Sequence, residues 1–173
     1  MIQHIEYGCY GKNKEIFNVK KYKKILIIVL GACLLLGTGC INEETEGQKI
    51  GDEVLRCLGE DDTQGLKDLF CAESQTSKDL ENQIQVGMDF FDGKDTSHFD
   101  AAVSGGESVR DGETVMQDYS ITYNELKTDT GKTYKVICDG YFICNEDPDR
   151  VGVSEIKIID EDGNECKIGE WID

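Results

Sequence analysis

Histidine is scarce in this sequence, and with it the usual components of hydrolytic and zinc-dependent active sites. Only two of the 173 residues are histidine, and His98 is the one that follows residue 40. No pattern around His98 indicates a Ser-His-Asp triad, and no C-x2–4-C spacing accompanies it for a zinc site. Nucleotide-binding loops of the forms G-x-x-x-x-G-K-[ST] and G-x-G-x-x-G are absent as well. The sequence therefore favours a protein that is not an enzyme, with no cofactor and no metal site.

Basic residues are also few after residue 40. Residues 41–173 contain 12 Lys and Arg against 33 Asp and Glu, a formal charge of 12 − 33 = −21. Such a surface repels phosphate groups, which argues against nucleic acid as a partner and against docking on anionic lipid headgroups. High solubility accounts for this charge. A cationic partner or loosely held cations are the alternatives.

No apolar run is long enough to cross a bilayer as a helix, which takes about 20 residues. The run Ile25–Leu36 has 12 residues and follows the basic segment Lys20–Lys24. A charged segment, a short apolar segment and small residues are together typical of an export signal. The small residues Gly37–Gly39 stand directly before Cys40, an order that resembles a lipobox.

The lipobox predicts that a diacylglyceryl group is attached to Cys40 and that the chain is cleaved before it. Because two or more acyl chains give stable anchoring, we expect a lipid-anchored protein on the extracellular face of the cell membrane. Residues 1–40 are then an N-terminal extension and a lipoprotein signal peptide, residues 41–47 an acidic tether, and residues 48–173 a single domain. The alternative is an ordinary signal peptide, or a signal anchor, with a chance cysteine.

Helical periodicity characterises the first half of the predicted domain. The apolar positions of 48–58 recur at i, i+4, i+7 and i+8, which predicts a helix: Ile50, Val54, Cys57 and Leu58. Asp62 or Thr63 can cap a second, shorter helix. A third helix is predicted after a capping box at Thr76 and Asp79, with Gly93 as its stop. Its apolar face consists of Leu80, Ile84, Met88 and Phe91.

After Gly93 the apolar period falls to 2. The odd positions of 115–123 and the even positions of 134–144 are mostly apolar, and each pattern predicts a half-buried strand. Residues 151–159 predict a strand with a bulge at Glu155–Ile156, residues 96–102 a weaker strand and residues 167–172 a final edge. Helices followed by strands predict an α+β domain, in which N-terminal helices pack on one face of a curved antiparallel sheet.

Five cysteines follow Cys40, an odd number that leaves at least one thiol without a partner in the chain. They are Cys57, Cys71, Cys138, Cys144 and Cys166. Cys138 and Cys144 stand about 20 Å apart along an extended strand, so they cannot bond to each other. Pairing of Cys57 with Cys71, or of Cys138 with Cys166, is geometrically open. The apolar faces on which most of them lie favour buried free thiols.

Five short segments occur in the order found in a family of uncharacterised lipoproteins from Gram-positive bacteria, which this chain resembles over about residues 48–173. The segments are 90–94 (FFDGK), 105–112 (GGESVRDG), 128–134 (TDTGKTY), 145–152 (NEDPDRVG) and 171–173 (WID). The resemblance implies the cone of the nuclear transport factor 2-like, or cystatin-like, superfamily, in which a bent sheet wraps around helices. Because the family is a domain of unknown function, the resemblance assigns no catalytic residue.

In such a cone, inward aromatic residues either fill the core or line a pocket with hydroxyl groups at its rim. The candidates for the pocket lining are Phe91, Tyr119, Tyr123, Tyr134 and Phe142. These features favour a non-catalytic module that binds an unknown small molecule or protein partner. Two alternatives stay open. One is an enzyme of the ketosteroid-isomerase type, which needs a desolvated carboxylate that the inward strand positions do not offer; the other is an immunity-like protein whose acidic face meets a basic partner.

Overall fold

All the described α-helices of the domain precede its sheet. The computed structural model describes residues 43–97 and 101–172, and residues 41–173 form one compact unit. Within the described residues the helices are α2 (Glu43–Gly59), α3 (Thr63–Leu69), α4 (Ala72–Gln75) and α5 (Leu80–Phe90). The strands are β1 (Ala102–Ser104), β2 (Glu107–Arg110), β3 (Glu113–Lys127), β4 (Thr133–Cys144), β5 (Gly152–Asp160) and β6 (Glu165–Gly169), with a 3-10 helix, η1 (Pro148–Arg150), before β5. The predicted α+β class is confirmed.

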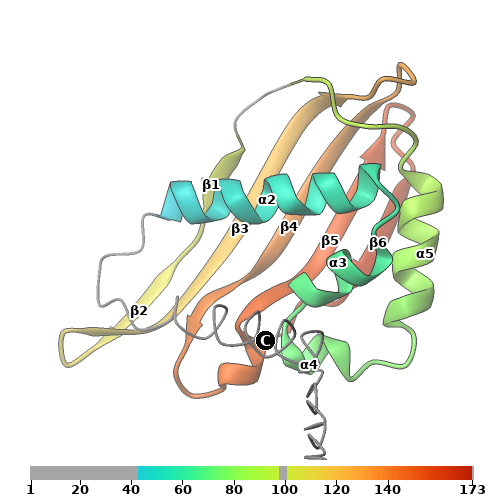
Figure 1. Ribbon diagram of the computed structural model, residues 1–173. Coiled ribbons are helices and arrows are strands. Elements are labelled where there is room, and N and C mark those ends of the chain that lie inside the picture. Colours follow the sequence, from blue (N-terminus) through green and yellow to red (C-terminus); the bar gives the residue numbers. More distant parts are fainter. Residues whose placement is uncertain (1–42, 98–100, 173) are drawn as a thin grey trace, which may run out of the picture. The chain divides into compact units, whose positions relative to one another are not determined.

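The six strands form one antiparallel sheet in the order β1-β3-β4-β5-β6, with β2 also paired to β3. The β2–β3 hairpin turns at Asp111 and Gly112, whose φ values of 55° and 86° are those that a tight two-residue hairpin turn requires. Figure 1 shows the curved sheet with α2 lying across it from β1 to the neighbourhood of α5. The helices therefore cover one face of the sheet, which we call the inner face.

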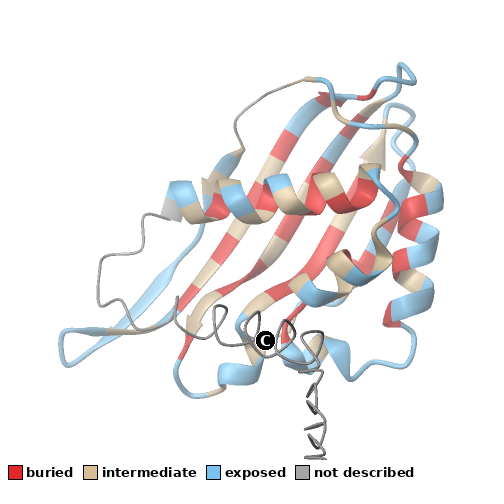
Figure 2. Cartoon of the chain, in the orientation of Figure 1, coloured by how far each residue is buried: buried red, intermediate tan, exposed pale blue. Residues whose placement is uncertain are grey.

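The inner face carries the predicted alternation. Burial in Figure 2 runs in stripes along the strands because alternate residues point to opposite faces. The buried strand residues that pack against the helices include Tyr119, Ile121, Val136, Cys138, Ile156 and Ile158. The strands predicted over 115–123, 134–144 and 151–159 are confirmed, whereas β2 was not predicted. The weak candidate at 96–102 lies partly outside the described residues, and the strand there begins at Ala102.

The helix boundaries differ from the prediction at two places. First, α2 begins at Glu43, so residues 43–47 of the expected tether are helical. A Cβ at Gly47 would lie 2.7 Å from the side chain of Val103, so the helix packs closely on β1. This tertiary contact accounts for helical structure where the sequence pattern predicts a tether. Second, the capping box is wrong, since Thr76 closes α4 and Asp79 precedes α5 without a capping hydrogen bond from its side chain. None of the helices in 43–97 and 101–172 has the length and apolar character to cross a membrane.

The other predicted cap and the bulge are close to their expected positions. Asp62 caps α3, and its Oδ1 accepts a hydrogen bond from the amide of Gly65 at 2.9 Å. The register between β4 and β5 shifts where Gly140 faces Val153, which makes Ser154 the extra residue of a bulge. The bulge therefore lies one position before the predicted one.

The outer face of the sheet carries charged residues and the end of the chain. Glu155 has a side chain only 3% exposed and forms ion pairs with Lys157 and Lys167. β6 ends at Gly169, earlier than predicted. Beyond it, the amide of Trp171 donates to Glu155 Oε2 at 3.2 Å, and its ring stacks on Tyr141 at a centroid distance of 5.0 Å. The last described residues thus pack against the outer face and shield the Glu155 carboxylate.

Candidate functional site

The five aromatic residues predicted to line a pocket lie in or against the core. Tyr119, Tyr123, Tyr134 and Phe91 are buried, and Phe142 is partly buried against them. They form contacts at separate places. The Tyr119 and Phe142 rings lie 4.4 Å apart, and the Phe91 and Tyr134 rings 4.8 Å apart. Of these two pairs, the second borders an open pocket.

Tyr134 closes the end of α5. Its hydroxyl donates to the carbonyl of Phe90 at 3.1 Å and accepts from the amide of Asp92 at 3.0 Å. A buried tyrosine hydroxyl normally finds such partners. Here both are backbone groups that the helix end leaves unpaired, so Tyr134 fixes where the chain leaves the helix.

The chain after α5 is then held against the β3–β4 turn. The amide of Lys94 donates to Asp129 Oδ1 at 2.8 Å, and the amide of Asp129 donates to the carbonyl of Lys94 at 2.9 Å. Thr130 Oγ1 donates to the carbonyl of Asp92 at 2.9 Å. Gly93 has φ = +93°, and a Cβ there would lie 2.5 Å from Asp129 Oδ1, so glycine is required on both counts. Two of the five resemblance segments, 90–94 and 128–134, meet through these bonds.

An open pocket of about 520 Å³ lies between this junction and the end of α2. We call it the aspartate pocket. Its buried apolar lining consists of Leu58, Met88 and Phe91. Its polar lining contains Asp61, Asp89, Asp92, Lys94, Asp129 and Thr130, with Gly59 and Gly93 between them. The pocket therefore combines an apolar floor with four carboxylates and a single ammonium group.

Two helix ends add to the negative potential of the aspartate pocket. Gly59 ends α2, which has Arg56 in its last turn, and Phe90 ends α5, which has no basic residue there. The carboxyl end of a helix carries a partial negative charge that favours cations. The pocket's own cation, Lys94, lies 3.7 Å from Glu60 Oε1. No hydrogen bond or ion pair engages the carboxylates of Asp61 and Asp92 within residues 43–97 and 101–172.

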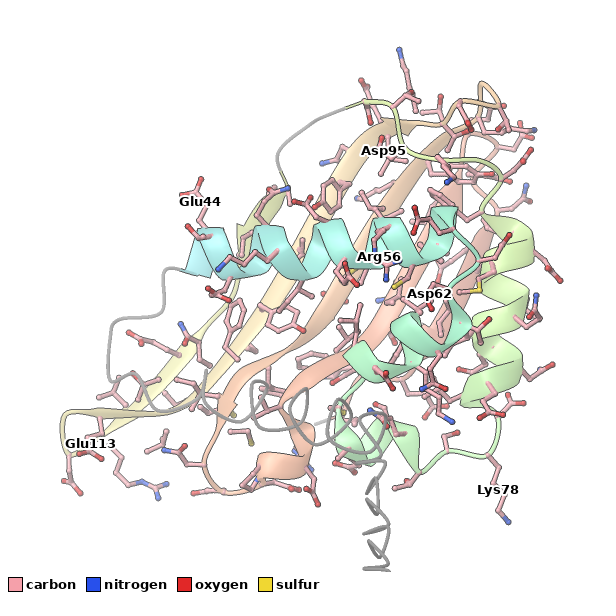
Figure 3. All side chains as sticks on the ribbon, viewed as in Figure 1. Glu44, Arg56, Asp62, Lys78, Asp95 and Glu113 are labelled. Carbon is pink, nitrogen blue, oxygen red and sulfur yellow. The ribbon has the colours of Figure 1, made fainter. Side chains whose placement is uncertain are left out.

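The corner between α2 and α3 is fixed by Arg56. Its guanidinium donates to Glu53, Glu60 and Asp62 at 2.7, 2.9 and 2.7 Å, and Figure 3 shows Arg56 and Asp62 at this corner. The hydrogen bond from Arg56, followed by that from the amide of Gly65, holds the pKa of Asp62 below its ordinary value. Asp62 therefore stays ionised beside the pocket, and the corner keeps its shape.

The charges and the apolar lining of the aspartate pocket fit a basic side chain. A lysine or arginine side chain has an apolar stem and a charged head, which match the floor and the carboxylates of the aspartate pocket. The lining holds no histidine or cysteine to act as a base or nucleophile. Among the residues that the structure describes, no group of three or more His, Cys, Asp or Glu is placed to hold a metal ion.

A second, smaller cavity of about 250 Å³ lies between α4, the start of α5 and the end of the chain. Its acidic residues are Glu73 and Glu170. Glu73 is already paired with Arg150, at 3.3 Å. This cavity is therefore a weaker candidate for a cationic ligand than the aspartate pocket.

The five described cysteines are free and buried, which confirms the preference for buried thiols over disulfides. Burial raises the pKa of Cys57 to about 11 and also raises the pKa of Cys138 and Cys166. These thiols are therefore protonated at neutral pH and poor nucleophiles. Cys40 and His98 lie outside the described residues.

One polar cluster was missed by sequence reasoning. Tyr123 donates to Asp52 Oδ1 at 2.8 Å, and Gln48 Nε2 donates to the same oxygen at 2.7 Å. Burial, and then the hydrogen bond to Asp52, raise the pKa of Tyr123. The polar positions 48 and 52 of α2 are one helical turn apart, but only the fold shows that a strand tyrosine lies opposite them.

Comparison with known protein families gives one match. The model of a domain of unknown function, DUF5104, matches residues 53–161. The chain belongs to this family. All residues that line the aspartate pocket lie within the DUF5104 match, as do four of the five resemblance segments. No curated protein matches the sequence.

Proposed function

We propose that this DUF5104 chain is a lipid-anchored, non-catalytic module that binds a cationic group of a protein partner on the extracellular face of the membrane. The observation that carries the proposal is the aspartate pocket. Four carboxylates and two helix carboxyl ends surround a buried apolar floor there. That combination favours a basic side chain because its charge and its stem are both satisfied.

The anchoring part of the proposal rests on the sequence alone. A basic segment, a 12-residue apolar run and Gly37–Gly39 precede Cys40, as expected of a lipobox. The expectation that the protein is a lipoprotein of a Gram-positive bacterium follows from the family resemblance over about residues 48–173. A curved antiparallel sheet with helices on its inner face is compatible with the nuclear transport factor 2-like cone.

The alternatives differ in what the pocket residues would have to do. An isomerase of the ketosteroid type needs a carboxylate whose ionised form is destabilised by burial. Asp52 is bonded to Tyr123 but is exposed, so it lacks that environment. An immunity-like protein that neutralises a basic partner uses the same acidic surface as our proposal and is one form of it.

The pocket can be tested with acetylated lysine and arginine peptides. We expect NMR amide shifts to concentrate at residues 58–61, 91–94 and 129–130, and to weaken when salt is raised. Asp61→Asn combined with Asp92→Asn should reduce affinity about tenfold or more, since both carboxylates line the pocket and neither has a partner among the described residues. Asp68→Asn combined with Asp149→Asn is the matched control, with the same charge change on exposed residues elsewhere. Equal losses in the two double variants would contradict the proposal.

The anchor can be tested by metabolic labelling with radioactive palmitate. We expect label on the wild-type protein and none on Cys40→Ala, which should leave the membrane fraction. Equal labelling of both proteins would show that Cys40 is not the acylated residue.

A further inference from the structure

The first described helix begins very close to the proposed lipid attachment site. Only Ile41 and Asn42 separate Cys40 from Glu43, where α2 starts. Three chain steps span at most about 11 Å between the Cα atoms of Cys40 and Glu43. If the lipid is on Cys40, as the proposed function holds, the start of α2 stays within that distance of the attachment point.

From Gly47 onward, α2 is fixed to the sheet and is not free to lengthen the tether. Gln48 Oε1 accepts from the amide of Ala101 at 2.7 Å, and Asp52 accepts from Tyr123 of β3. Gly47 packs directly on Val103 of β1. Unwinding α2 past Gly47 would break these contacts, so the anchor constrains a helix that is held to the sheet from Gly47 onward.

The aspartate pocket lies at the other end of the same helix. α2 has 17 residues, and its ends are therefore about 24 Å apart at 1.5 Å per residue. Gly59 and Asp61 line the pocket at the far end. Figure 3 shows Glu44 at the start of α2 and Asp62 just beyond its other end.

The charge of the domain opposes its lying flat on an anionic bilayer. Residues 41–173 carry a formal charge of 12 − 33 = −21, and anionic lipids repel such a surface. Near the anchor, Lys49 is the first cation, and it is paired with Glu46 at 2.7 Å. The charge of Lys49 is therefore balanced within the helix and is not left over to attract anionic headgroups.

We infer that the end of the domain formed by the first turns of α2 and by β1 faces the membrane. The aspartate pocket then stands at the opposite end, away from the lipid headgroups. A cationic partner approaches it from outside the cell rather than along the bilayer surface. The short junction thus keeps this end of the domain near the headgroups, while repulsion between negative charges opposes direct contact with them.

Energy transfer from the lipidated protein to acceptor-labelled lipids in phosphatidylglycerol vesicles tests this orientation. A dye would be attached to Glu44→Cys at the start of α2, or to Lys132→Cys beside the pocket; both positions are exposed, and the five described native thiols are buried. We expect transfer from position 44 to exceed that from position 132 by roughly twofold or more, because the length of α2 separates them. A ten-residue Gly-Ser insertion after Ile41 should remove most of the difference.

The outcomes separate the orientation from the anchor. Equal transfer from both positions with the native junction overturns the orientation alone. Absence of transfer from both positions, with the protein recovered apart from the vesicles, overturns the lipid anchor and the orientation with it. Peptide binding to the aspartate pocket is measured without vesicles and stands or falls independently of either result.

Discussion

The inner and outer faces of the sheet come from the same strands but are stabilised by different interactions. On the inner face, Ile121 of β3 and Ile156 of β5 are fully buried beneath the helices. On the outer face, Glu155 is almost as buried, but two lysines and a backbone amide surround it. The inner face depends on apolar packing and the outer face on a partnered charge.

The comparison also reverses an ordinary expectation about polar groups. The charged Glu155 on the outer face is fully partnered, whereas the hydroxyl of Tyr119 on the inner face is buried without a hydrogen-bond partner among the described residues. Burial raises the pKa of that hydroxyl, so it remains a neutral group. Position in the fold, rather than the polarity of a residue, determines whether its polar atom contributes to stability.

The largest contrast between the faces is expected from the same substitution on each. Ile121→Ala removes a fully buried side chain from the inner face and should lower the free energy of unfolding by about 2–5 kcal/mol. Ile137→Ala makes the same change on the outer face, at a half-buried position of the adjoining strand, and should cost less than half as much. Urea denaturation of the two variants measures both values. Equal costs would mean that the outer face is packed as tightly as the inner one.

A smaller effect is expected from Glu155→Gln, which should cost about 1–3 kcal/mol at pH 7 because charged hydrogen bonds are lost. Burial raises the pKa of Glu155, but the hydrogen bonds from Lys157 and Lys167 outweigh it, and the net shift is downward. A carboxyl group with a lowered pKa stabilises the fold above its unfolded pKa, and this contribution is lost as the pH falls through the folded pKa. The difference between wild type and variant should therefore shrink below about pH 4.5.

Asp139→Asn provides the control for Glu155. Asp139 also lies on the outer face, but it is 3.8 Å from Lys157 Nζ and more exposed. Its substitution should cost well under 1 kcal/mol. A cost equal to that of Glu155→Gln would show that the deeper burial and additional partners of Glu155 do not strengthen its contribution.

The smallest effect, and one of opposite sign, is expected from Tyr119→Phe. Removing a buried hydroxyl that has no partner should leave stability unchanged or raise it by up to about 1 kcal/mol. Tyr134→Phe removes a hydroxyl with two backbone partners and should be destabilising by about 1–2 kcal/mol. Thermal unfolding followed by circular dichroism distinguishes the two. A clear loss of stability in Tyr119→Phe would reveal a partner for its hydroxyl, such as an ordered water.

Local periodicity predicted much of the fold. The period of 2 in 115–123 and 134–144 identified β3 and β4 because a half-buried strand must alternate. The stripe that includes Val54 and Leu58 identified α2 for the corresponding reason. Neither the five-residue extension of α2 nor β2 could be read in this way. The first depends on Gly47 meeting Val103, and the second is exposed on both faces and so has no alternation.

The candidate site was predicted only in part. Phe91 was expected beside a pocket and lies there, but it was grouped with Tyr119 and Tyr123, which lie elsewhere in the core. None of the pocket aspartates was among the predicted site residues. Nothing in the order of residues brings Asp92 and Asp129 together; the antiparallel pairing of β3 and β4 and the Tyr134 hydroxyl do so.

The sequence by itself determined the properties that depend on neighbouring residues: the strand and helix periods, the net acidity, and the short apolar run that precedes Gly37–Gly39 and Cys40. The tertiary structure alone decided which acidic groups converge at the end of α2 and which one, Glu155, is buried on the sheet. The physical reason is that periodicity is a property of successive residues. Convergence, in contrast, depends on the strand register and on where each helix ends, and contacts between distant residues fix both.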